Sequence, residues 1–350
     1  MTRALTEREL NRALLARQCL LQRSSASIPE ILERMGGLQA QYAPSMYIGL
    51  WSRQAGFRRD ALTQALRERE VVQGTLLRTT IHLVSAADYW PFAVAVRQAR
   101  RAGWLRATRN AVPAGACAEA ADLVRDHLRA NGPIRRAELQ ELVGRERVTA
   151  AGLWLDLVRV PPSGTWERRR ADLYDSAEHW LGPPDPGLTR DKAVEHIARR
   201  YLQGFGPSTP AELADWAGLP LADIVAALAR LDLVRYEADP SGQELVDLPG
   251  APLPDAATEA PPRLLPTWDA CLLVHARRKR IVPEEHRPLI FHTKNPQSLP
   301  TYLVDGAVGG AWKYDAGQGN IQLDPFQPLD ARTGRSVQAE ADRIGAELFG

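Results

Sequence analysis

Two glutamines, Gln39 and Gln41, stand two residues apart in an otherwise apolar stretch, where residues 37–44 read Gly-Leu-Gln-Ala-Gln-Tyr-Ala-Pro. Burying a primary amide without hydrogen bonds costs about 1–3 kcal/mol, so such a pair is more typical of a polar site. Residues at i and i+2 share a face only on an extended backbone. Pro44 disfavours a helical Ala43 but is tolerated in the first turn of a new helix. We therefore predict that both amides converge on one cleft, just before a junction.

Amide side chains restrict the chemistry that this pair could perform. An amide is neutral across physiological pH and cannot act as a general base. It can orient a water molecule and turn its carbonyl oxygen toward a cation. That help suffices only where the leaving group is already activated. Gln39 and Gln41 are therefore the candidate catalytic residues.

Motifs of several enzyme classes are absent from the chain. The sequence holds no Walker-type loop, no GxGxxG opening a helix after a strand, no GxSxG and no HExxH. NTP hydrolysis, nicotinamide chemistry, serine-hydrolase chemistry and zinc proteolysis are excluded on this basis. The three cysteines, Cys19, Cys117 and Cys271, lie far apart without metal-ligand spacing, so no metal and no other cofactor is expected.

Basic residues are nearly all arginine: 44 lysines and arginines include only four lysines, and the formal net charge is +2. Arginine suits phosphate and base edges, although a codon bias explains the excess equally well. The densest run spans residues 275–280, His-Ala-Arg-Arg-Lys-Arg, between two apolar stretches that we predict to be strands. A basic hairpin tip of this kind could enter a DNA groove. It could instead protect an edge strand by charge.

Two further polar positions stand in apolar surroundings. His82 alternates with apolar neighbours in a predicted strand, where a lone histidine is more often a hydrogen-bonded core residue than a catalyst. Trp268 and Asp269 begin a segment that is otherwise apolar through Leu273, so the carboxylate needs a partner there, such as an arginine.

A repeated order of elements is expected to position these residues. Helices are predicted at 6–22, capped by Thr6 with Glu9, from Ser27 onward, with Ser27 as the cap, and from Asp60 onward. Strands follow at 71–77 and 79–84. A second set has helices at 118–130, 135–143 and 148–158 and a wing at 165–174. A third has helices at 191–202, 211–217 and 221–231 and a hairpin at 233–248. Helices followed by a hairpin are typical of a winged helix, a module that binds nucleic acid or docks proteins.

The remainder of the chain predicts a small β domain. After a Pro/Ala linker at 249–262, strands are predicted at 264–276, 288–293, 301–304, 307–314 and 321–323, closed by a helix at 332–348. The fold class is therefore α+β, with three tandem winged-helix units and a small C-terminal β-barrel-like domain. The predicted boundaries are 1–115, 116–185, 186–250 and 251–350. The chain lacks a membrane-length apolar run and a signal peptide, so a cytoplasmic protein is expected.

Five short segments together resemble the AlkZ/YcaQ superfamily of winged-helix DNA glycosylases, although each is weak alone. They are residues 38–41, 77–84, 162–166, 264–269 with its basic continuation, and 304–312. Residues 39–41 are similar to the family's Gln-apolar-Gln motif, and Gln41 favours the AlkZ-like branch, because the other branch has Asp there. Trp268, Val274 and Arg277 depart from the usual residues.

The resemblance implies a C-shaped arrangement around duplex DNA and excision of cationic N7-alkylated purines, in some members including interstrand crosslinks. It implies a monofunctional glycosylase that acts as a monomer near the nucleoid, with double-stranded DNA as its partner. Within the matched segments, the residues that we predict to contact DNA are Arg78, His82, Trp268, Asp269, His275, Arg277, Arg278, Lys279 and Arg280. The alternative function is a non-catalytic winged-helix DNA-binding protein or transcriptional regulator.

Overall fold

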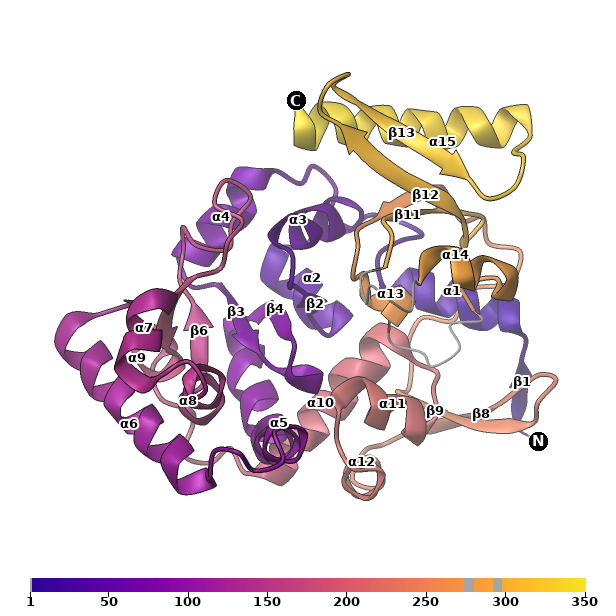
Figure 1. Ribbon diagram of the computed structural model, residues 1–350. Helices are drawn as coiled ribbons and strands as arrows, with labels where there is room; N and C mark the ends of the chain where they lie inside the picture. The colour runs from indigo at the N-terminus through magenta and orange to yellow at the C-terminus, as the bar shows by residue number, and fades with distance from the viewer. Residues whose placement is uncertain (1, 274–279, 292–297) are drawn as a thin grey trace.

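The computed structural model describes residues 2–273, 280–291 and 298–350. It is a mixed α/β structure in which helices surround three separate sheets (Figure 1). Within these ranges, no helix is long and apolar enough to cross a membrane.

The first set of elements carries the glutamine pair. Its bounds are α2 (Ile28–Met35), β2 (Leu38–Gln39), α3 (Ala43–Trp51), α4 (Arg59–Arg67), β3 (Val71–Thr75) and β4 (Ile81–Ser85), with a 3-10 turn η1 (Leu77–Thr79) before β4. The predicted cap of α2 is confirmed, because Ser27 and Glu30 form a reciprocal capping box. The new helix that Pro44 allowed is α3, although its extent was not predicted. All nine of its residues are buried, so it lacks the amphipathic pattern by which a surface helix is recognised.

A second set follows the long helix α5 (Ala86–Ala107). It consists of α6 (Ala114–Asn131), β5 (Ile134–Arg135), α7 (Arg136–Val143), α8 (Val148–Leu155), β6 (Leu157–Arg159), β7 (Leu173–Ser176) and α9 (Ala177–Leu181). The wing predicted at 165–174 falls mostly in the loop that connects the antiparallel strands β6 and β7, and residues 165–172 form no strand. Instead, the Ser163 side chain binds the backbone of residues 170, 172 and 173 and holds this segment as a compact loop.

A third set is joined by the N-terminus. It contains α10 (Arg190–Phe205), α11 (Pro210–Ala217), α12 (Leu221–Leu228), β8 (Val234–Ala238) and β9 (Gln243–Asp247). The N-terminal β1 (Arg3–Leu5) pairs in parallel with β8, and α1 (Glu7–Arg17) follows behind the confirmed Thr6 capping box. Residues 3–17 therefore pack against the third set, while the predicted domain boundaries at 115, 185 and 250 stay predictions.

The three sets share one topology. In each, a helix is followed by a short extended segment, two helices and two strands, and the short segment pairs antiparallel with the last strand. The pairings are β2 with β4, β5 with β7, and the single bridge of Ser208 to Val246 in β9. The first two sets also share one six-stranded sheet, in the order β2-β4-β3-β6-β7-β5. This continuous sheet brings α7 and α8 close to the turn between β3 and β4.

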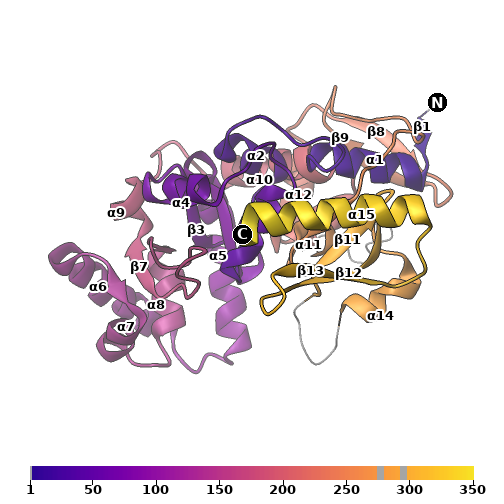
Figure 2. The same ribbon diagram turned by 90° about the horizontal axis from the view of Figure 1, so that it is seen from above.

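The C-terminal part is an antiparallel sheet with one long helix across it. Its order is β10 (Arg263–Leu265), β11 (Thr301–Val304), β12 (Ala307–Asp315) and β13 (Asn320–Pro325), and among the described strands β10 and β13 are its edges. The helix α15 (Ala331–Ile344), continued by η3 (Gly345–Phe349), lies along the sheet (Figures 1 and 2). Its apolar face joins Tyr302 and Trp312 in one core with α2, α3 and α4.

Two strand predictions in this part are wrong. The strand predicted at 264–276 ends at Leu265, and α13 (Ala270–Leu273) follows. The strand predicted at 288–293 begins instead with the helix α14 (Arg287–Ile290), where Pro288 occupies the first turn, preceded by the turn η2 (Glu284–His286).

Candidate functional site

The two glutamines come together as the i, i+2 spacing predicted. Gln39 ends β2 and is 7 % exposed, whereas Gln41 lies two residues on, in a bend, and is exposed. The Gln39 Nε2 group donates a hydrogen bond to Oε1 of Gln41. The side-chain oxygen Oε1 of Gln39 and the Nε2 group of Gln41 form no hydrogen bond with any described residue. One acceptor and one donor are therefore left side by side.

His82 stands directly across from Gln39 on the neighbouring strand. The Ala40 amide donates to the carbonyl of Ile81 at 2.8 Å, which makes Gln39 and His82 the intervening non-hydrogen-bonded pair. Side chains of such a pair share a face and lie closer than those of a hydrogen-bonded pair. His82 is 3 % exposed, so it is buried beside the glutamine.

The imidazole of His82 is uncharged at neutral pH. Its pKa is lowered to about 3, mainly by burial and also by the nearby charge of Arg78, while a hydrogen bond to the Thr80 carbonyl opposes both effects. The Nδ1 atom lies 3.1 Å from that carbonyl oxygen, so a neutral ring donates there and keeps Nε2 as an acceptor. His82 therefore offers neither a positive charge nor a proton to a substrate near pH 7.

A cavity of about 280 Å³ opens beside Gln41, which we call the Gln41 cavity. Its wall on one side is the turn between β3 and β4, with Thr75, Thr79 and Thr80. On the other side it is formed by α7, α8 and β6, with apolar residues and the arginines Arg136 and Arg159. No carboxylate is among the described residues that line it. The Gln41 cavity is thus neutral to basic, and its polar groups are amides, hydroxyls and guanidinium groups.

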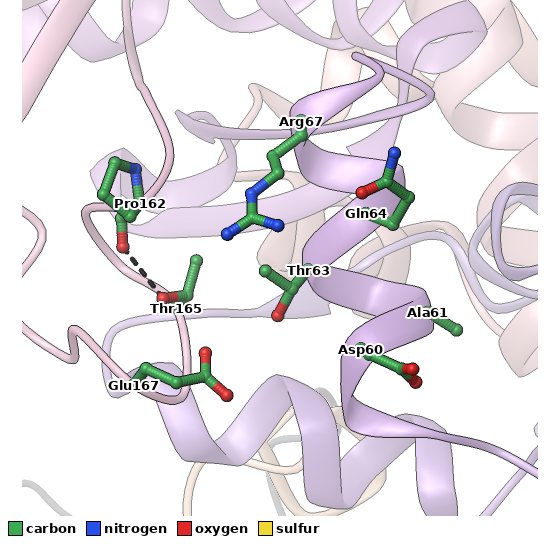
Figure 3. Close-up of a pocket in the computed structure, with 8 residues that line it drawn as sticks. All are labelled: Asp60, Ala61, Thr63, Gln64, Arg67, Pro162, Thr165 and Glu167. Carbon is green, nitrogen blue, oxygen red and sulfur yellow. Dashed lines mark hydrogen bonds between the residues drawn. The ribbon is translucent and has the colours of Figure 1, made fainter.

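A second cavity, of about 530 Å³, lies between α4 and the loop at 162–167 (Figure 3). Thr63, Gln64 and Arg67 line it from the helix, and Thr165 and Glu167 line it from the loop. The Thr165 hydroxyl donates to the Pro162 carbonyl at 2.8 Å and holds the loop in place. Since neither Gln39 nor Gln41 lines this cavity, it is separate from the candidate site.

Asp269 has the arginine partner that its apolar surroundings required. Its carboxylate accepts two hydrogen bonds of 2.9 Å from Arg53, and both side chains are 0 % exposed. The backbone amide of Cys271 donates to it as well. A carboxylate held in this way cannot reach DNA, so the predicted DNA contact of Asp269 is corrected to a structural role.

The other predicted DNA contacts have different surroundings. The guanidinium group of Arg78 donates to the Trp216 carbonyl, and that of Arg280 donates to the Pro207 carbonyl at 3.1 Å. Trp268 is half-buried, and its backbone amide donates to the Ser298 hydroxyl. The remaining four, His275, Arg277, Arg278 and Lys279, lie outside the described residues. The expected strand before this basic run is a helix, so a hairpin is not supported on that side.

Sequence reasoning missed Arg159, although a signal was present. Residues 157–160 read Leu-Val-Arg-Val, so an arginine stands inside an apolar strand, much as Gln39 does. What could not be read from the sequence is its neighbourhood. Gln41, Thr75 and Arg136 come from three other segments of the chain.

The comparisons with known proteins bear on the whole chain. The model of the AlkZ-like DNA glycosylase family matches residues 32–346. Among solved structures, the chain is similar to the DNA glycosylase AlkZ of Streptomyces sahachiroi, with a TM-score of 0.81 and 19 % sequence identity over 98 % of this chain and 97 % of that one. A search of curated proteins gives no match. Because the family model covers nearly the full length, the chain belongs to the AlkZ-like DNA glycosylase family and is a DNA glycosylase.

Proposed function

We propose that this glycosylase hydrolyses the N-glycosidic bond of cationic N7-alkylated purines in duplex DNA, with Gln39 and Gln41 as its catalytic residues. The observation that carries the proposal is the neutral amide pair beside a cavity that no carboxylate lines. Alkylation at N7 gives the purine a positive charge, so the base can leave without being protonated. A neutral purine needs an acid or a strong base, and this site offers neither.

The reaction follows from the groups at the site. Water attacks C1′ while the electron pair of the C1′–N9 bond leaves with the base, which becomes neutral, and a proton passes to solvent. The sugar carries positive charge in the transition state, and the free Gln39 carbonyl oxygen is suited to stabilise that charge and to hold the water. The products are a free alkylpurine and an abasic site. Neither reaction nor site uses a lysine, so strand cleavage through a Schiff base is not expected.

Shared topology supports a proposal for how DNA is held. We infer that the three sets of elements are winged-helix units, since each has the order helix, short strand, two helices and two strands, with the short strand paired to the last. In such units the second helix of the helix-turn-helix pair reads the duplex. We further infer that these units and the C-terminal sheet form a C-shaped molecule that binds duplex DNA as a monomer, with Trp268 and the basic run at 275–280 among its contacts.

Single-turnover excision tests the substrate class. Matched duplexes carry one N7-methylguanine, one hypoxanthine as a neutral lesion, or no lesion. We expect release of N7-methylguanine and an abasic site that breaks only on alkaline treatment. Excision of hypoxanthine at a comparable rate would show that the enzyme activates neutral bases, and the proposal would then be wrong.

A further inference from the structure

Arg159 is half-buried, and its charge is not balanced in the way that the charges of the most buried described arginines are. Four arginines that are at most 4 % exposed each have a carboxylate partner; they are Arg12, Arg17, Arg53 and Arg100. Arg159 forms no ion pair with any described residue. Its Nε is buried without a hydrogen-bond partner, which is costly for a polar group, so an additional acceptor would stabilise this guanidinium group.

The contacts that Arg159 does make are weak. Both of its terminal nitrogens lie 3.4 Å from the Thr75 hydroxyl, at the long limit of a hydrogen bond, and its Nε has no partner. The guanidinium carbon lies 5.8 Å from the ring centroid of Tyr174. Burial lowers the pKa of Arg159, and the charge of Arg136 lowers it further. The side chain is therefore held in place, while most of its donors stay unused.

Arg159 lines a cavity that suits an anion. Arg159 and Arg136 both line the Gln41 cavity, together with the hydroxyls of Thr75, Thr79 and Thr80. Arg136 likewise forms no ion pair among the described residues. Guanidinium groups bind phosphate through paired, charge-assisted hydrogen bonds, and hydroxyls complete such sites. Two unpaired cations and several hydroxyls, with no lining carboxylate, are the donor set of a phosphate site.

We propose that the Gln41 cavity binds one backbone phosphate of the damaged DNA strand, with Arg159 as its principal ligand and Arg136 as its second. The inference rests on the proposed function, which brings the sugar of the lesion to Gln41. A phosphate held there fixes the register of the strand, so that C1′ lies at the glutamine pair. Arg159 is thus a positioning residue, because it touches the strand and not the bond that breaks.

The phosphate contact is tested by combining a substitution in the protein with a change of one phosphate in the DNA. Each phosphate within three positions of the lesion is replaced, one at a time, by an uncharged methylphosphonate, and dissociation constants are measured for the wild-type protein and for Arg159→Gln. At one position the wild type should lose about tenfold or more in affinity, and Arg159→Gln should lose little further. Arg335→Gln, an exposed arginine on α15, removes the same charge and should lose as much as the wild type at that position.

A second reading of the same cavity is that it holds oxygen atoms of the N7 substituent. In that case the effect of Arg159→Gln would depend on the substituent and would be additive with every methylphosphonate, which would overturn the proposal. Thermal unfolding of Arg159→Gln distinguishes a lost contact from a lost fold, and Arg159→Lys, which keeps the charge, should recover part of the affinity. Because binding needs no catalysis, absence of excision would contradict the proposed function while leaving this test intact.

Discussion

Replacing Asp269 by asparagine should destabilise the protein strongly. The substitution keeps the shape of the side chain but leaves Arg53 charged, 0 % exposed and without its carboxylate. Breaking a buried ion pair at one partner typically costs about 3–5 kcal/mol, because the remaining charge is uncompensated. With an unfolding entropy of about 2.1 cal/mol/K per residue, 350 residues convert that cost into a fall in Tm of about 4–7 °C.

Calorimetry of the wild type, Asp269→Asn and a matched control measures this effect. The control is Glu244→Gln, which breaks the pair with Arg235, whose side chains are 60 % and 62 % exposed. An exposed pair contributes about 0–1 kcal/mol, so its Tm should move by about 1 °C. If Asp269→Asn shifts Tm no more than the control does, Asp269 does not form a stabilising buried ion pair with Arg53, and its predicted DNA contact must be reconsidered.

Two further predictions concern the strands that carry the site. The pKa of His82 is lowered from an ordinary 6.5 to about 3 in the folded protein, so its contribution to stability is present above pH 6.5 and is lost as pH falls toward 3. His82→Gln should therefore narrow the difference between the Tm at pH 7 and the Tm at pH 5. An unchanged difference would contradict the burial of His82. Gly74→Ala should lower the free energy of unfolding by about 1–3 kcal/mol, measured by thermal unfolding, because the new Cβ would lie 2.6 Å from the buried ring of Tyr89. The control Gly103→Ala on α5, whose new Cβ meets nothing within 4 Å, should not destabilise the protein. Equal losses of stability for both variants would refute the packing argument.

Local signals predicted much of the fold. The Thr6 capping box, the Ser27 cap and the strands β3 and β4, which are rich in β-branched residues, depend on residues close together in the chain, and the structure has them where the pattern indicates. The convergence of Gln39 and Gln41 is equally local, since it needs only an extended backbone over three residues.

Contacts between distant residues explain what the sequence did not reveal. The apolar run after Leu265 resembles a strand, yet Asp269 pairs with Arg53, 216 residues away, and the chain turns into α13. The apolar residues that follow Pro288 likewise resemble a strand, yet Pro288 lies in the first turn of a helix. Arg159 belongs to the same class, because its proposed role depends on a buried Nε without a partner and on the lack of an ion pair with any described residue, which only the packed structure reveals.

In the proposed mechanism, two neutral amides suffice to direct hydrolysis of a base that is already cationic. Single-turnover excision of N7-methylguanine is measured for Gln39→Ala and Gln41→Ala, with binding to the same duplex measured in parallel. Removing one preorganised polar group from such a site typically costs about 10²–10³-fold in rate. We expect losses of that size with DNA affinity nearly unchanged. Excision at the wild-type rate by either variant would contradict the assignment of that glutamine.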